Sequence, residues 1–200
     1  MAVVTTGRTG PGAVDPGPAA AGAFTWDDLQ HAPHDNLRRE LVGGQLLVTP
    51  SPSNRHQVAV SSLNRLLEAA CPHDLRVVLS PCDWKLSAVT AFVPDLMVVH
   101  RDEFHLDSTF TGTPLLVVEI RSASTAATDR TLKREQYALP GAAAYWLVDP
   151  GGPAAGQVPS LTVLHLADGA YAEVATVRGE EPFGAERPVP VTVVPDRLVR

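Results

Sequence analysis

The sequence has little of the positive charge that nucleic-acid-binding proteins usually have. Its formal net charge is −6, and only two of its 200 residues are lysine, so most of the basic groups are arginines. A basic face supplies much of the attraction to a phosphate backbone. The acidic balance therefore weighs against nucleic-acid binding. It does not exclude it, because carboxylates that bind a metal also make an active site acidic.

Cysteines and long apolar runs are scarce as well, and each shortage excludes a class of protein. Cys71 and Cys82 are too few for a disulfide framework, and their spacing fits no zinc finger. No run approaches the length of a membrane span, and the first residues lack the apolar core of a signal peptide. We therefore expect a cytoplasmic protein with no membrane partner.

Composition divides the chain into two parts. Residues 1–23 are dominated by Gly, Pro, Ala and Thr without a hydrophobic period, which predicts a flexible tail. Residues 24–200 have the length of one ordinary domain, and the whole chain is 44% hydrophobic. The predicted organisation is a tail followed by a single domain.

Hydrophobic spacing within the domain predicts an α/β fold. Gly43-Gly44 and Asp168-Gly169 lie between short apolar runs and predict two hairpins. Helical spacing predicts one helix from Ser53 to about Ala70 and another from Thr128 to Leu139. Further strands are predicted over residues 75–80, 83–87, 92–99, 114–120, 144–149 and 189–194. We expect a central mixed β-sheet flanked by helices, with an additional N-terminal hairpin and a C-terminal hairpin.

Two of the apolar runs each contain a carboxylate where a buried strand should have none. Asp95 follows Pro94, and Glu119 follows five apolar residues. An unpaired charge there costs several kcal/mol, so it must be neutralised, hydrogen-bonded or bound to a cation. A hard cation such as Mg²⁺ would remove the repulsion between two neighbouring carboxylates and could activate water for attack on a phosphoryl group. Arg121 and Lys133 are the nearest cationic residues in sequence, and the set suggests a metal-dependent phosphodiesterase.

Pro94-Asp95…Glu119-Ile120-Arg121 resembles the PD-(D/E)xK nuclease signature, with arginine where lysine is expected. Other segments extend the resemblance in order: Glu40 to Leu46, Pro50 to Ser53 with His56, Val93 to Val99, Val118 to Thr125, Asp129-Arg130 with Lys133 and Tyr137, and Tyr145 to Pro150. This ordered series resembles the Uma-type family of bacterial putative restriction endonucleases. The similarity runs from about Phe24 to the C-terminus.

The resemblance implies a restriction-endonuclease-like core in which Asp95 and Glu119 bind Mg²⁺, with Mn²⁺ as a possible substitute. Glu40 matches the family's early glutamate and could be a third metal ligand. Lys133 fits the lysine on the following helix that compensates when the position two after the glutamate is not lysine. The implied activity is an endonuclease acting on nucleic acid, with DNA as the expected substrate.

Several of these residues also have a plainer interpretation. Asp95 could cap its strand, Glu119 could form a structural salt bridge, and Glu40 could be an ordinary hairpin residue. His56 is expected on a helix surface rather than at phosphate or metal. Arg121 could stabilise charge in the site, although it cannot act as a general base, or it could pair with Asp95 or Glu119 in a degenerate site.

The main alternative function is therefore a nuclease fold that no longer cuts. Such a protein would be a nucleic-acid-binding or protein-interaction module, and the acidic charge and Arg121 favour it. Cutting a duplex needs two sites and the C-terminal hairpin offers a sheet edge, so a homodimer is possible; the sequence leaves the oligomeric state open.

Overall fold

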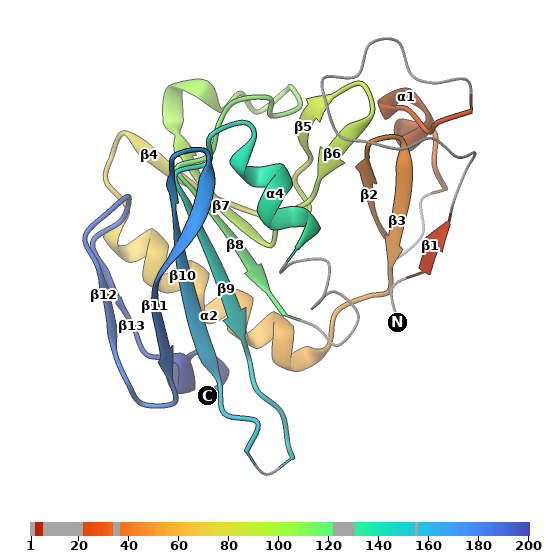
Figure 1. Cartoon of the computed structure of the whole chain (residues 1–200). Helices are drawn as coiled ribbons and strands as arrows, with labels where there is room; N and C mark the ends of the chain where they lie inside the picture. Colours follow the sequence, from red (N-terminus) through yellow and green to blue (C-terminus); the bar gives the residue numbers. More distant parts are fainter. Residues whose placement is uncertain (1–2, 6–21, 34–36, 122–130, 155) are drawn as a thin grey trace.

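Strands dominate the part of the chain that the computed structural model describes, which comprises residues 3–5, 22–33, 37–121, 131–154 and 156–200 (Figure 1). Its largest sheet has six strands, in the order β11 (Ala170–Arg178), β10 (Ser160–Ala167), β9 (Ala144–Asp149), β8 (Leu116–Ile120), β7 (Leu96–His100) and β4 (Leu75–Leu79). Neighbouring strands are antiparallel except for β8 and β9, which are parallel. The central sheet is therefore mixed, as predicted.

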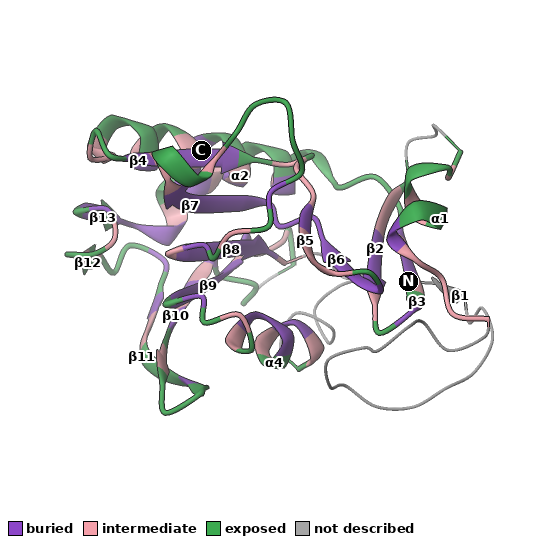
Figure 2. Cartoon of the chain, turned by 90° about the horizontal axis from the view of Figure 1, so that it is seen from above, coloured by how far each residue is buried: buried purple, intermediate pink, exposed green. Residues whose placement is uncertain are grey.

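Two helices cover opposite faces of this sheet: α2 (Asn54–Ala70) and α4 (Leu132–Ala138). Figure 2 shows β7, β8 and β9 between them. Side chains alternate across a strand, so Leu96 and Val98 of β7 belong to the core that includes α2, whereas Met97 belongs to the core that includes α4. Burial on both faces explains why the strands read as continuous apolar runs.

A second sheet stands beside the first and supplies part of the site described below. Its five strands lie in the order β1 (Val3–Thr5), β3 (Gln45–Thr49), β2 (Arg38–Val42), β6 (Thr90–Phe92) and β5 (Trp84–Ser87). The β2–β3 hairpin turns through Gly43 and Gly44, whose φ angles of 55° and 81° are those that a two-residue hairpin turn requires. The short helix α1 (Trp26–Gln30) packs Trp26 against Leu41 and Ala91 of this sheet.

The predicted long helix is confirmed almost to the residue. Helix α2 begins after Ser53, whose side chain accepts a hydrogen bond from the His56 N–H at 3.3 Å. Such an N-terminal cap satisfies one of the amide groups that a helix leaves without a partner. The C-terminal hairpin is also confirmed, as β10 and β11.

The single strand predicted over residues 92–99 is wrong. The structure has two strands there: β6 ends at Phe92 in the second sheet, and β7 begins at Leu96 in the first. Pro94 lies between them and has no N–H to donate to a sheet. Asp95 therefore lies at the crossing between the two sheets rather than within a strand.

The predictions for the N-terminal tail, the second helix and the last strand agree with the described structure only in part. Val3–Thr5, inside the segment predicted as a tail, forms β1 and pairs with β3. Residues 122–125 and the predicted start of the second helix at 128–130 lie outside the described residues. Strand β13 (Val191–Val193) pairs with β12 (Phe183–Ala185), a partner that was not predicted. The described chain also includes two 3₁₀ helices, η1 (Arg101–Glu103) and η2 (Pro195–Val199).

No helix in the described ranges is both long enough and apolar enough to cross a membrane.

Candidate active site

Three carboxylates converge where the two sheets meet. Asp95 comes from the crossing between β6 and β7, Glu119 from β8 and Glu40 from β2. Their residues are only 2%, 2% and 3% exposed, so each charge must be compensated within the protein. Among the described residues, the cationic side chains of Lys133 in α4 and Arg38 in β2 do this.

Asp95 is held by donors from three directions. Its Oδ2 atom accepts a hydrogen bond from the Ile120 N–H at 2.7 Å and lies 3.2 Å from His56 Nε2. Its Oδ1 atom accepts from Arg38 Nη1 at 2.7 Å. Burial alone would raise the pKa of Asp95, but the hydrogen bond with His56, the charge of Arg38 and the Ile120 N–H lower that pKa to about 2. The carboxylate therefore stays ionised although it is buried.

Glu119 and Glu40 share one lysine. Lys133 Nζ donates to Glu119 Oε1 at 2.9 Å and to Glu40 Oε1 at 3.0 Å. Glu40 also accepts from the Val93 N–H at 3.0 Å. Burial raises the pKa of Glu40, but Lys133, Arg38 and this backbone hydrogen bond more than offset the effect, and the pKa is lowered.

Helix α4 presents two groups to Glu119. Tyr137 follows Lys133 by four residues, so both lie on one helix face, and its hydroxyl donates to Glu119 Oε1 at 2.6 Å. Burial and the nearby charges of Glu119 and Glu40 raise the pKa of Tyr137 well above its ordinary value. Tyr137 is therefore a permanent hydrogen-bond donor that fixes the position of the Glu119 carboxylate.

Arg38 is a central residue of the cluster that was not predicted from the sequence. Besides Asp95, its guanidinium contacts Glu119 Oε2 at 3.4 Å and Glu40 Oε1 at 3.5 Å, and it donates to the Val93 carbonyl. Burial lowers the pKa of Arg38, but the three carboxylates raise it well above its usual value. One signal was present in the sequence: Arg38 and Glu40 are two apart in a predicted strand and therefore share a face.

The structure brings together four of the five residues singled out from the sequence. Asp95, Glu119, Glu40 and Lys133 form one buried cluster. Arg121 lies beyond the end of β8, and its Nη1 atom pairs with Asp149 Oδ2 at 2.6 Å at the end of the parallel neighbour β9. This ion pair is partly exposed, with 28% and 33% of the two side chains accessible.

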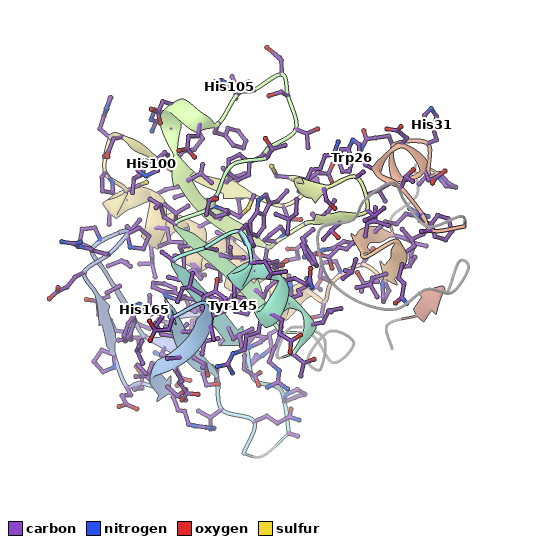
Figure 3. The ribbon with its side chains drawn as sticks, turned by 45° about the horizontal axis from the view of Figure 1, so that its top comes forward. Trp26, His31, His100, His105, Tyr145 and His165 are labelled. Carbon is purple, nitrogen blue, oxygen red and sulfur yellow. The ribbon has the colours of Figure 1, made fainter. Side chains whose placement is uncertain are left out.

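His56 was expected on a helix surface, and that interpretation is wrong. The residue is 5% exposed, because the first turn of α2 packs toward the cluster and places His56 Nε2 against Asp95. Its Nδ1 atom is buried and has no hydrogen-bond partner among the residues that the structure describes. The histidines labelled in Figure 3, namely His31, His100, His105 and His165, lie apart from one another.

A cleft of about 740 Å³ opens beside the cluster. Its wall includes Arg38, His56 and Asp95, together with Leu29 from α1 and Val60 from α2. A ligand in this cleft would therefore meet the Asp95 side of the cluster first.

The donor chemistry of the cluster suits a hard divalent cation, because all three acidic residues offer carboxylate oxygens. Among the described residues, however, no three Asp, Glu, His or Cys side chains are already grouped as metal ligands. Arg38 lies against Asp95 Oδ1 and Glu119 Oε2 and so occupies one oxygen of each of these two carboxylates. The carboxylate oxygens and their negative charge therefore suit a divalent cation, provided that the Arg38 guanidinium moves away from them.

Comparison with known proteins identifies the family and the fold of the chain. A family model with the description "Uma2: Putative restriction endonuclease" matches residues 26–195. The crystal structure of a putative nuclease belonging to DUF820 from Anabaena variabilis is similar, with a TM-score of 0.65 and 20% sequence identity; the match covers 88% of this chain and 97% of that chain. At this identity the likeness establishes a shared fold. No curated protein matches the chain.

Proposed function

The chain belongs to the Uma2 family, and on that premise we propose that it is a metal-dependent endonuclease that hydrolyses phosphodiester bonds in nucleic acid, with DNA as the substrate. The observation that supports this most strongly is the convergence of Asp95, Glu119 and Lys133 from three separate elements at one buried point beside a cleft. Burying two carboxylates and a lysine is expensive without a function that uses them.

Asp95 and Glu119 would hold Mg²⁺, or Mn²⁺ in its place, with Glu40 as a further oxygen ligand. The bound ion would polarise a phosphoryl oxygen and lower the pKa of an attacking water. The protein's own donors position these ligands: the Ile120 N–H orients Asp95, and the Tyr137 hydroxyl orients Glu119. Fixed carboxylates need no rearrangement during the reaction.

Lys133 would supply positive charge beside the carboxylates, which would offset the negative charge that develops on the phosphoryl group. We assign this role to Lys133 rather than Arg121, because Lys133 contacts Glu119 directly whereas Arg121 pairs with Asp149. His56 would hold Asp95 on the side that faces the cleft.

Cleavage of plasmid DNA tests the proposal. Purified protein is incubated with supercoiled plasmid, single-stranded DNA and RNA of matched sequence, with Mg²⁺ or Mn²⁺, beside Asp95→Asn and the exposed control Asp74→Asn. We expect cutting of DNA by the wild type and by Asp74→Asn, and none by Asp95→Asn. Equal cutting by all three proteins would show a contaminating nuclease. Absence of cutting by the wild type under every condition would refute the catalytic proposal.

The second candidate function is a nucleic-acid-binding module that no longer cuts. The position of Arg38 favours it, because a guanidinium already neutralises the carboxylates that a metal would need. Calorimetric titration with Mn²⁺ separates the two candidates. A nuclease site binds Mn²⁺ and loses that binding in Glu119→Ala, whereas a module of the second kind needs no such site.

A homodimer stays a prediction of this proposal. Strand β11 is one of the two edge strands of the central sheet and could pair with a second copy. Sedimentation velocity at several concentrations would measure the oligomeric state.

A further inference from the structure

The contacts of the cluster divide each of two carboxylates into a fixed oxygen and a displaceable one. Asp95 Oδ2 is held by the Ile120 N–H, and Glu119 Oε1 is held by Lys133, both buried and built into the central fold. The second oxygens, Asp95 Oδ1 and Glu119 Oε2, both face Arg38. One guanidinium therefore occupies one oxygen of each proposed metal ligand.

The two cations of the cluster differ in how easily they can leave. Lys133 is enclosed, with only 2% of its side chain accessible. Arg38 has 23% of its side chain accessible and forms part of the cleft wall. Its guanidinium can move into the cleft without opening the hydrophobic core, whereas the Lys133 ammonium cannot.

The charges of the cluster also indicate that Arg38 leaves when a divalent cation binds. With His56 counted as neutral, Asp95, Glu119 and Glu40 contribute three negative charges and Lys133 one positive charge, so without Arg38 these residues have a net charge of −2. One divalent cation neutralises that charge. A divalent cation added beside Arg38 would leave the cluster with a positive excess in a buried position, which is unfavourable.

We propose that Arg38 is a displaceable cation, which holds Asp95 and Glu119 in place in the metal-free protein and moves into the cleft when a divalent cation binds. This inference rests on the metal site of the proposed function. It adds that Arg38 and the metal compete for the same two oxygens, so that the arginine lowers metal affinity and stabilises the metal-free fold.

Calorimetric titration with Mn²⁺ tests the competition in wild type, Arg38→Met and the neighbour control Arg39→Met. Arg39 Nη1 donates to the Pro33 and Leu37 carbonyls. We expect Arg38→Met to bind Mn²⁺ more tightly than the wild type, on the order of tenfold or more, which is within the usual range of coupling between two ligands. Arg39→Met should match the wild type. Without metal, Arg38→Met should melt at a lower temperature than Arg39→Met, and saturating Mn²⁺ should close most of that gap.

Two results of the titration would overturn the inference, and the first of them can be told apart from failure of the proposed function. If the wild type binds Mn²⁺ and Arg38→Met binds it no more tightly, the displacement is wrong while the metal site stands. If neither protein binds Mn²⁺, the metal site and the displacement fall together. Should Arg38→Met fail to fold, a crystal structure of the wild type with Mn²⁺ decides the question: the guanidinium must have left Asp95 Oδ1, and its presence there beside the metal would contradict the inference.

Discussion

Replacing Lys133 with methionine should destabilise the protein more than any other single loss of a positive charge in the chain. Methionine keeps most of the side-chain volume but removes the ammonium that both Glu119 Oε1 and Glu40 Oε1 accept from, at 2.9 and 3.0 Å. Of the described residues, Arg38 and neutral donors would then have to compensate two buried carboxylates that lie close together. Such a site must either take up a proton or open to water.

The expected magnitude follows from the burial of the group. Lys133 is 1% exposed, and removing one partner of a buried ion pair typically costs about 3–5 kcal/mol. For a chain of this length, each kcal/mol lowers the melting temperature by roughly 2–4 °C, so we expect a fall of roughly 6–20 °C. Adding Glu40→Gln removes one of the uncompensated charges and should restore part of the loss. The double-mutant cycle should therefore show clear coupling between the two positions.

Urea denaturation near neutral pH is the assay, and the other lysine provides a matched control. Lys85 is partly exposed and its Nζ atom lies 5.3 Å from the centre of the Trp26 ring, an interaction worth about 0.5–2 kcal/mol depending on its exposure. Lys85→Met should therefore have a small effect. If Lys133→Met unfolds at the same urea concentration as Lys85→Met, or if Glu40→Gln adds independently to it, the account of the buried cluster is wrong.

Three further predictions concern individual groups of the site. In the folded protein the pKa of Asp95 is lowered to about 2. Its carboxylate therefore contributes roughly 2–3 kcal/mol to the unfolding free energy above about pH 4, and this contribution is lost as the pH falls toward 2. Asp95→Asn should flatten that part of the plot of unfolding free energy against pH, and an unchanged slope would contradict the assignment. Tyr137→Phe should lower the unfolding free energy by about 1.5–3 kcal/mol and slow cleavage, because it removes the hydroxyl that orients Glu119. Tyr171→Phe is the matched control, because the Tyr171 hydroxyl donates to a backbone carbonyl outside the cluster. This variant should lose stability and keep its cleavage activity. A similar loss of cleavage in both variants would argue against the role of Tyr137. Arg121→Met should lose less than about 1 kcal/mol of stability and keep its activity in the plasmid assay, because the substitution breaks a partly exposed ion pair. Loss of cutting in this variant would show that Arg121 takes part in the reaction.

The parts of the fold that could be predicted are those that local sequence determines. Ser53 followed by apolar residues at helical spacing is enough to place α2, and Gly43-Gly44 is enough to place the first hairpin. Asp95 and Glu119 stood out because charge in an apolar run is energetically anomalous. Each of these signals lies within a few residues of the feature that it predicts.

The parts that could not be predicted depend on contacts between distant segments. Arg38 reaches Asp95 across 57 positions, and only the meeting of the two sheets makes that contact possible. The same crossing split the strand predicted around Pro94, although the proline itself was a signal for it. The direction of Arg121 depends on β9 as its parallel neighbour, and strand pairing cannot be read from a single strand.

Nicking of supercoiled plasmid with and without a chelator tests whether Asp95 and Glu119 form a metal-dependent nuclease site. We expect nicking that requires Mg²⁺ or Mn²⁺, stops when the chelator is added, and is absent in Glu119→Gln. Nicking that continues in the chelator or in Glu119→Gln, or a wild-type protein that leaves the plasmid intact with either metal, would contradict this expectation.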